Sequence, residues 1–337
     1  MEGVFMRYFL LILLLLLLAV GLLFLIAELI RRQLVNRKTF SLPAFLGKWI
    51  KGNEMPDAYA ADAAEAEKRF LSLPLQRVEL TAGDGAQLRA LVLSPRRPNG
   101  KLIIACHGAR SSGKGEFCFF APDFFRLGYT LILPDHRGCG DSDGDYMGYG
   151  THESRDAFLW VEYAKTNFPD MERYLLGVSM GAATVLMMSR DNRTEVDIRG
   201  MIADCSYTSA WDEFSYQMKA SFHLTEFPLL PVCDFLNRHI CGYSFRDASP
   251  IRAVKFAKCP ILFIHGGADD FVPVYMLEQL YDACTTDKYR LTIPGAPHAR
   301  SYYIDPQRYT KAVEAFIKLT QKPSADGYGS IPNEDHS

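Results

Sequence analysis

Residues 175–184, "LLGVSMGAAT", set a serine between two glycines, directly after an apolar run and directly before helix-forming residues. One interpretation is a tight strand-to-helix turn without chemistry, because glycine accepts positive φ and lets backbones approach closely. The other is a strained turn that lifts the Oγ of Ser179 clear of the end of a sheet, where a serine can act as a nucleophile. The rest of the chain has to decide between them.

The composition allows one large domain and argues against several classes of site. With 337 residues, 48% of them apolar, the chain can bury the core of a single α/β domain. A net charge of −2 gives no reason to expect a nucleic-acid partner. The eight cysteines form no C-x-x-C pair, so neither a zinc site nor a dense disulfide framework is expected. We expect most of them to be buried small hydrophobes and predict no metal and no cofactor.

Alternating strand and helix signals predict one doubly wound, mostly parallel sheet over residues 76–321. The pattern begins with a hairpin, because two alternating stretches (76–82 and 86–94) flank "GDG". Six mostly apolar runs follow and read as buried parallel strands, at residues 101–108, 129–138, 173–179, 199–206, 259–267 and 288–296. Ligands of such sheets bind at the carboxyl ends of the strands.

Residues 205–258 interrupt this alternation with a long segment rich in aromatic and aliphatic side chains. Two ordinary helices packed on the sheet edge would account for it. The segment leaves the carboxyl end of one strand and returns before the next, which favours a lid over the active site. In that case we expect Trp211 and Phe222 to line the acyl-binding site.

A nucleophilic serine needs a base, and the base needs a third group that fixes its tautomer. On this type of sheet the partners follow the serine in the order acid, then histidine. His298 fits the base, because it lies in a turn directly after the last strand. The later histidines that fit less well lie in the lid segment, within a strand or in the tail: His223, His239, His265 and His336.

The acid is expected just past the preceding strand, where "GGADDFVP" offers Asp269 and Asp270. Asp269 fits better because it leaves enough residues to close the loop. Either aspartate could instead cap the following helix. Asp270 therefore stays open as an alternative acid, as does Asp204 at the end of another strand.

Two backbone N–H groups are expected to form the oxyanion hole, because such donors must be in place where charge develops. One belongs to Met180, directly after the nucleophile, at the start of a helix. The other belongs to Ala109, which follows His-Gly in the loop after an early strand. His107 precedes the serine in the chain, so we interpret it as holding this loop and not as a base.

Five motifs together resemble the α/β-hydrolase superfamily, in particular its membrane-tethered serine-aminopeptidase-like and monoglyceride-lipase-like branch. They are "CHG", "LILPDHRGCGDSDG", "LLGVSMGAAT", "IHGGADDFVP" and "IPGAPH". The resemblance implies that Ser179 is the nucleophile, Asp269 the acid and His298 the base. It also implies that the turn from Arg137 to Asp141 is architectural. "CHGARSSG" lacks the second glycine after His-Gly that some esterase lines carry, so bulky tertiary-alcohol esters are less expected as substrates than other acyl compounds.

An N-terminal membrane anchor is predicted over residues 8–30, because residues 8–27 carry no charge and are long enough to cross hydrocarbon. A cleaved signal peptide would need a shorter apolar run followed at once by small residues, whereas "ELIRRQLVNRK" follows here. Residues 31–75 are predicted to form a juxtamembrane tether with a short helix. The polar tail, residues 322–337, is predicted to be disordered.

The charges around the apolar run favour a cytoplasmic catalytic domain. Arg31, Arg32, Arg37 and Lys38 follow the run, whereas Arg7 alone precedes it, and flanking cations tend to stay on the cytoplasmic side. Unpaired cysteines agree with a reducing compartment. Tethered hydrolases of this type also face outward, so the opposite orientation stays open.

The sequence thus predicts a membrane-anchored serine hydrolase that cleaves an ester, thioester or amide bond through an acyl-enzyme. The expected partners are a small-molecule or lipid-like acyl substrate and the membrane itself. Two alternatives remain: an acyltransferase on the same fold, and a non-catalytic membrane-tethered scaffold. The oligomeric state and the identity of the substrate leave no signal in the sequence.

Overall fold

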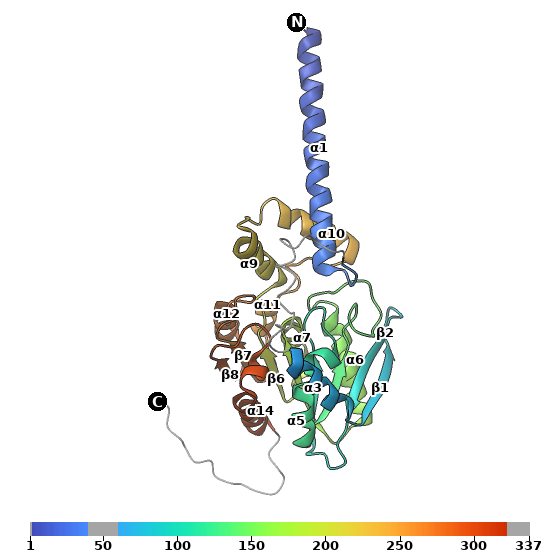
Figure 1. The fold of residues 1–337 in the computed structure, drawn as a ribbon, viewed down its shortest axis with the longest axis vertical. Coiled ribbons are helices and arrows are strands. Elements are labelled where there is room, and N and C mark those ends of the chain that lie inside the picture. The colour runs from blue at the N-terminus through green and yellow to red at the C-terminus, as the bar shows by residue number, and fades with distance from the viewer. Residues whose placement is uncertain (1, 40–59, 322–337) are drawn as a thin grey trace.

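A computed structural model describes residues 2–39 and 60–321 and contains one eight-stranded sheet (Figure 1). The strand order is β1-β2-β4-β3-β5-β6-β7-β8. The strands are β1 (Leu75–Thr81), β2 (Gln87–Leu93), β3 (Lys101–Cys106), β4 (Thr130–Pro134), β5 (Glu172–Val178), β6 (Gly200–Asp204), β7 (Ile261–Gly266) and β8 (Lys288–Ile293). β1 and β2 form the predicted hairpin, β2 also pairs antiparallel with β4, and all other pairs are parallel. The predicted fold class is confirmed.

Helices cover both faces of the sheet, and two separate apolar clusters fill the space between. α6, α7, α11 and α12 contribute to the cluster on one face, whereas α3, α4, α5 and α14 contribute to the other. The helices are α1 (Glu2–Val35), α3 (Ala60–Leu71), α4 (Gly113–Phe117), α5 (Phe120–Arg126), α6 (Glu153–Asn167), α7 (Met180–Met188), α8 (Asn192–Asp197), α9 (Ala210–Phe222), α10 (Leu229–Cys241), α11 (Pro250–Val254), α12 (Tyr275–Ala283), α13 (Ser301–Ile304) and α14 (Pro306–Thr320). All eight cysteines are buried and unpaired, as the sequence predicted.

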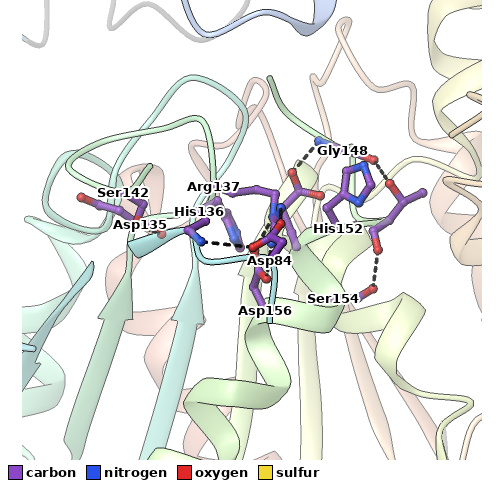
Figure 2. Close-up of polar contacts among 12 residues, drawn as sticks. Asp84, Asp135, His136, Arg137, Ser142, Gly148, His152, Ser154 and Asp156 are labelled. Atoms are coloured by element: carbon purple, nitrogen blue, oxygen red, sulfur yellow. Dashed lines mark hydrogen bonds and ion pairs between the residues drawn. The ribbon is translucent and has the colours of Figure 1, made fainter. Parts of the chain in front are cut away.

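The turn after β4 is held by ion pairs and hydrogen bonds (Figure 2). Arg137 makes two contacts with Asp156 of α6, at 2.5 and 2.6 Å, and a third with Asp84 of the hairpin at 2.9 Å. The carboxylate of Asp135 accepts N–H bonds from Gly113 and Asp141, both at 2.7 Å. These bonds fasten the turn to α4, α6 and the hairpin, which agrees with an architectural role.

The segment between β6 and β7 divides into two parts. α9 and α10 lie at the end of the domain from which α1 projects (Figure 1). α11 instead packs against α7 and α12 on one face of the sheet, where Val254 joins the apolar cluster. Residues 205–258 therefore combine a cap over one end of the domain with an ordinary packed helix.

The N-terminal helix α1 is apolar and long enough to cross a membrane over residues 4–35. Its first part projects away from the domain (Figure 1), and its last turns are packed against it. Ala27 and Val35 are fully buried, the ring of Phe24 contacts Phe235 of α10, and the N–H of Met147 donates to the carbonyl of Val35. Residues 31–35, which we expected to begin a tether, thus continue α1 and belong to the folded body.

Most of the predicted tether and the whole predicted tail, residues 322–337, lie outside the described residues. Within the described part, the short helix expected before the hairpin is α3. Ala66 and Phe70 of this helix are fully buried in the apolar cluster that also contains α4, α5 and α14.

Candidate active site

Ser179 lies in a strained turn between β5 and α7, with φ of 55° and ψ of −116°. The flanking glycines make this turn sterically feasible. A Cβ on Gly177 would lie 2.2 Å from the carbonyl oxygen of Gly181, and a Cβ on Gly181 would lie 2.0 Å from that of Cys106. Strain of this kind persists only where the surrounding structure holds it in place, and the geometry agrees with the predicted turn that exposes the serine.

His298 and Asp269 lie beside Ser179, each in a loop that follows a strand of the same sheet. The Nε2 atom of His298 lies 2.9 Å from the Oγ of Ser179, and its Nδ1 lies 2.8 Å from the Oδ2 of Asp269. With the imidazole proton on Nδ1, that N–H donates to the carboxylate and Nε2 accepts the serine O–H. The structure therefore brings together the three side chains that the sequence singled out.

Asp269 is held as a carboxylate by its surroundings. Its burial alone would raise the pKa, but the charge of His298 and hydrogen bonds from His265 and His298 outweigh burial and hold the pKa well below its usual range. The other oxygen, Oδ1, accepts N–H bonds from Phe271 at 3.0 Å and Val272 at 2.8 Å. An ionised, fixed carboxylate orients the imidazole and stabilises its protonated form.

Neither alternative acid is bonded to the imidazole. Asp270 is exposed, next to Asp269 in the chain. Asp204 is buried, and its Oδ1 accepts a bond from the hydroxyl of Ser301 at 2.9 Å. Burial raises the pKa of Asp204 to about 6, against the opposing effect of the Ser301 bond.

The two proposed oxyanion donors line the same cavity as Ser179. Met180 is the first residue of α7, so its N–H has no acceptor within the helix. Ala109 follows Gly108, whose Cβ, if present, would lie 3.5 Å from the Cβ of Ser179. The loop after β3 therefore passes close to the serine.

His107 is fully buried behind this loop. Its Nδ1 lies 2.6 Å from the carbonyl oxygen of Gly108, and its Nε2 accepts the N–H of His136 at 2.9 Å. Both ring nitrogens are thus occupied by backbone groups, which agrees with a role in holding the loop.

A cavity of about 650 Å³ opens at Ser179. Aromatic side chains line much of it. They come from α4, α5 and the residues between them, from α9, from the loop after β7 and from the segment after His298: Phe117, Phe119, Phe120, Phe214, Phe271, Tyr302, Tyr303 and Tyr309. Trp211 and Phe222, which we expected here, are not among the lining residues; Trp211 lies in a separate surface pocket.

One group of potential metal ligands occurs among the described residues: Cys205, Asp269 and His298, whose ligand atoms lie within 4.8 Å of one another. Burial raises the pKa of Cys205 well above its usual value, so its sulfur is held as a thiol. A metal needs the thiolate, and the other two side chains are already bonded to each other. The donor set does not fit a metal.

Several residues at this site gave no signal in the sequence. Gln33 and Leu34, at the end of α1, line the cavity together with Ser179. The guanidinium of Arg110, next to Ala109, donates to the backbone carbonyls of Gln33, Leu34 and Asn36. Glu213 and Gln217 were also missed, although their spacing of four residues puts them on one face of α9 with Phe214.

Comparisons with known proteins agree with this fold. A family model described as the alpha/beta hydrolase fold matches residues 101–227. The uncharacterized protein YqkD of Bacillus subtilis is 32% identical over 219 residues, which make up 64% of this chain and 70% of YqkD. The lysophosphatidylserine lipase ABHD12 of Danio rerio is 26% identical over 173 residues, 48% of this chain and 41% of that protein.

The fold is also found among solved structures. An esterase of Pyrococcus furiosus, Pf2001, superposes with a TM-score of 0.60 at 23% identity, covering 74% of this chain and 94% of the esterase. At this identity the match speaks for the fold alone. Taken with the sequence match to YqkD and the order of the eight strands, it shows that the chain belongs to the α/β-hydrolase superfamily.

Proposed function

We propose that this chain is a membrane-anchored serine hydrolase that cleaves an ester, thioester or amide bond of an acyl substrate. The observation that carries the proposal is the hydrogen-bonded chain Ser179–His298–Asp269 at the mouth of an apolar cavity. A scaffold without activity has no need of a strained serine, a buried imidazole and an ionised carboxylate in one line.

In the first half of the proposed reaction, the Oγ of Ser179 attacks the substrate carbonyl while the Nε2 of His298 takes the hydroxyl proton. The carboxylate of Asp269 stabilises the imidazolium that forms. The N–H groups of Ala109 and Met180 donate to the oxyanion of the tetrahedral intermediate. As the intermediate collapses, the leaving group takes the proton from Nε2 and departs, and the acyl group remains on Ser179.

In the second half, a water molecule takes the place of the leaving group. His298 removes one proton from the water, whose oxygen attacks the acyl carbonyl. Collapse of the second intermediate releases a carboxylic acid and returns the proton to Ser179. The largely aromatic walls of the cavity favour an apolar acyl chain.

We further propose that α1 anchors the protein in a bilayer and that the α9–α10 edge of the lid meets the membrane surface. Large apolar side chains are exposed along this edge: Leu224, Phe227, Phe235 and Ile240. Phe24, in the uncharged part of α1, contacts Phe235 of α10, so α10 lies beside that part of α1. A lipid-like acyl substrate, supplied from the same bilayer, fits this arrangement.

A fluorophosphonate probe tests the proposal, because it phosphonylates only a serine that is activated by a neighbouring base. The full-length protein in detergent micelles is expected to be labelled at Ser179, as read by peptide mass spectrometry. Ser179→Ala is the matched control and should stay unlabelled. A wild-type protein that takes no label and turns over no ester, thioester or amide would refute the proposed function.

A further inference from the structure

Two buried polar atoms in the wall of the catalytic cavity have no hydrogen-bond partner. Seven such side-chain atoms occur among the described residues, and two of them belong to residues that line this cavity: Oε2 of Glu213 and Oε1 of Gln33. A buried polar group without a partner lowers the stability of the fold, because it has lost its hydrogen bonds to water. Polar atoms of this kind in a ligand cavity call for a partner on the ligand.

Glu213 is held rigidly on α9 and is only 4% exposed. Its Oε1 accepts a bond from the Nε2 of Gln217 at 3.0 Å. The same Nε2 donates at 2.5 Å to the carbonyl of Phe271, whose ring packs against His298. Both N–H donors of Gln217 are therefore used, and they fix the carboxyl group with Oε2 as its one unpaired atom.

The electrostatic surroundings favour the uncharged form of this carboxyl group. Burial raises the pKa of Glu213 well above its usual value, a hydrogen bond from Gln217 opposes this, and the negative charges of Asp269 and Asp212 raise it further. A neutral carboxyl group offers an O–H donor and a carbonyl acceptor. A hydroxyl group has the same two capacities, whereas an ammonium group would require a buried carboxylate and would lose its own hydration.

Gln33 brings a second unpaired polar atom, the acceptor Oε1, to the same wall from a distant part of the chain. It lies in the last turn of α1 and is 4% exposed. Tyr149 connects the two helices, because its hydroxyl donates to the carbonyl of Leu34 at 2.8 Å and its ring lies 5.0 Å from that of Phe214. The end of α1 and the inner face of α9 are thus joined through the Tyr149 side chain in the cavity wall.

We propose that Glu213 and Gln33 form a hydrogen-bonding subsite for a hydroxyl group of the substrate. The inference rests on the proposed hydrolase activity and makes the preferred substrates hydroxylated acyl compounds. Glu213 is then a specificity-determining residue that takes no part in proton transfer at Ser179. A site built to bond a hydroxyl group discriminates strongly against the analogue that lacks it, because its own polar atoms are then left unpaired.

Two matched ester pairs test the subsite in the full-length protein in detergent micelles. Butyl decanoate and 4-hydroxybutyl decanoate differ by a hydroxyl on the alcohol; methyl decanoate and methyl 10-hydroxydecanoate differ by one on the acyl chain. We expect kcat/KM to favour the hydroxylated member of at least one pair by about tenfold or more. Glu213→Leu should abolish this preference and still hydrolyse the plain esters, and Glu213→Gln, which keeps a donor and an acceptor, should retain most of it.

Gln33→Leu is the second variant and should reduce the same preference. Labelling of Ser179 by the fluorophosphonate probe shows that each variant is folded. A labelled, active wild-type enzyme without preference in either pair overturns the subsite and leaves the proposed function standing. An unchanged preference in Glu213→Leu also overturns the subsite.

The amine 4-aminobutyl decanoate tests whether the bound group is a hydroxyl. If its kcat/KM is higher than that of 4-hydroxybutyl decanoate, and if Glu213→Gln removes this difference, the assignment to a hydroxyl is overturned. Absence of both labelling and turnover refutes the proposed function itself.

Discussion

The Nε2 of His298 lies 2.9 Å from the Oγ of Ser179, although 119 positions separate the two residues in the chain. β5 ends at Val178 and β8 at Ile293, and β6 and β7 lie between them in the sheet. The serine is fixed by its strained turn, so the loop after β8 has to cross the ends of these strands to reach it. Because Asp269 is in turn bonded to His298, we expect the three side chains to act as one unit.

Ser179→Ala and His298→Ala are each expected to lower kcat by several orders of magnitude, about as much as both changes together, because neither side chain works without the other. Asp269→Asn should also cost heavily, since an amide cannot stabilise the imidazolium and favours the wrong tautomer. Steady-state hydrolysis of a short-chain ester, with melting temperatures as the check on folding, measures this.

Asp270→Asn is the matched control, because Asp270 is adjacent but exposed. It should keep wild-type activity. If Asp270→Asn loses activity while Asp269→Asn keeps it, the acid has been assigned to the wrong residue.

The sheet and the three candidate catalytic residues were predictable from the sequence because both depend on local patterns. Short apolar runs predict buried strands. The two glycines of "GVSMG", Gly177 and Gly181, allow the tight turn that carries Ser179. The three residues follow parallel strands whose carboxyl ends share one edge of the sheet, so they were expected to meet there. Their order along the chain is the one known for this type of sheet.

The cavity wall was not predictable, because it depends on how distant helices pack. Nothing in "ELIRRQLVNRK" shows that Gln33 would face a cavity formed by α9, since its neighbours read as charged flanks of a membrane span. Likewise, the sequence does not show which side chains of α9 face the cavity. Phe214 and Glu213 line the cavity, whereas Trp211 packs outward beneath Arg246.

Phe214→Ala should shift the preference of the enzyme toward longer or bulkier acyl chains, because the ring of Phe214 lines the cavity and its loss enlarges it. Trp211→Ala removes a comparably buried ring from the same helix outside the cavity. Each change should cost about 3–5 kcal/mol of stability. The comparison of kcat/KM over a series of chain lengths separates them: an equal effect of both variants on the series would argue against a cavity role for Phe214.

The stability of the protein should depend on Asp204 at mildly acidic pH. Burial raises the pKa of Asp204 to about 6 in the folded state, against about 3.9 when unfolded. Between these values the folded state holds a proton that the unfolded state has released, so this group makes the protein less stable as the pH rises from about 4 to about 6. The total change is about 3 kcal/mol.

Asp204→Asn removes this contribution, because an amide does not titrate. The melting temperature of the variant relative to wild type should therefore rise over that pH window and level off above it. Thermal unfolding at half-unit steps of pH measures the difference. A difference that is constant from pH 4 to pH 7 would show that Asp204 does not titrate as its burial implies.

Arg110 is expected to couple the end of α1 to the loop that carries Ala109. Its guanidinium bonds the backbone carbonyls of Gln33, Leu34 and Asn36, which lack partners within the helix. Arg110→Ala should therefore lower kcat by about tenfold with little change in KM, because a displaced N–H donor at the oxyanion weakens the transition state.

Arg37→Ala is the matched control for this change. Arg37 also ties the end of α1 to the domain, through the carbonyls of Gly140 and Ser142, but it does not touch the Ala109 loop. Both variants should lower the melting temperature by a few degrees. Equal kcat values in the two variants would show that Arg110 only fastens the helix.

The orientation of the anchor can be tested with a single introduced thiol. All eight natural cysteines are buried, so a membrane-impermeant maleimide should not react with the wild-type protein. Val196 is 74% exposed on α8 and does not belong to the α9–α10 edge that we propose meets the membrane. The four cations that follow the apolar run predict a cytoplasmic domain, so Val196→Cys in intact cells should react only after the membrane is permeabilised.

Wild-type protein under both conditions is the control for natural thiols, and a cytosolic protein with an exposed thiol reports on membrane integrity. Reaction of Val196→Cys in intact cells, while that cytosolic thiol stays protected, would place the hydrolase domain outside.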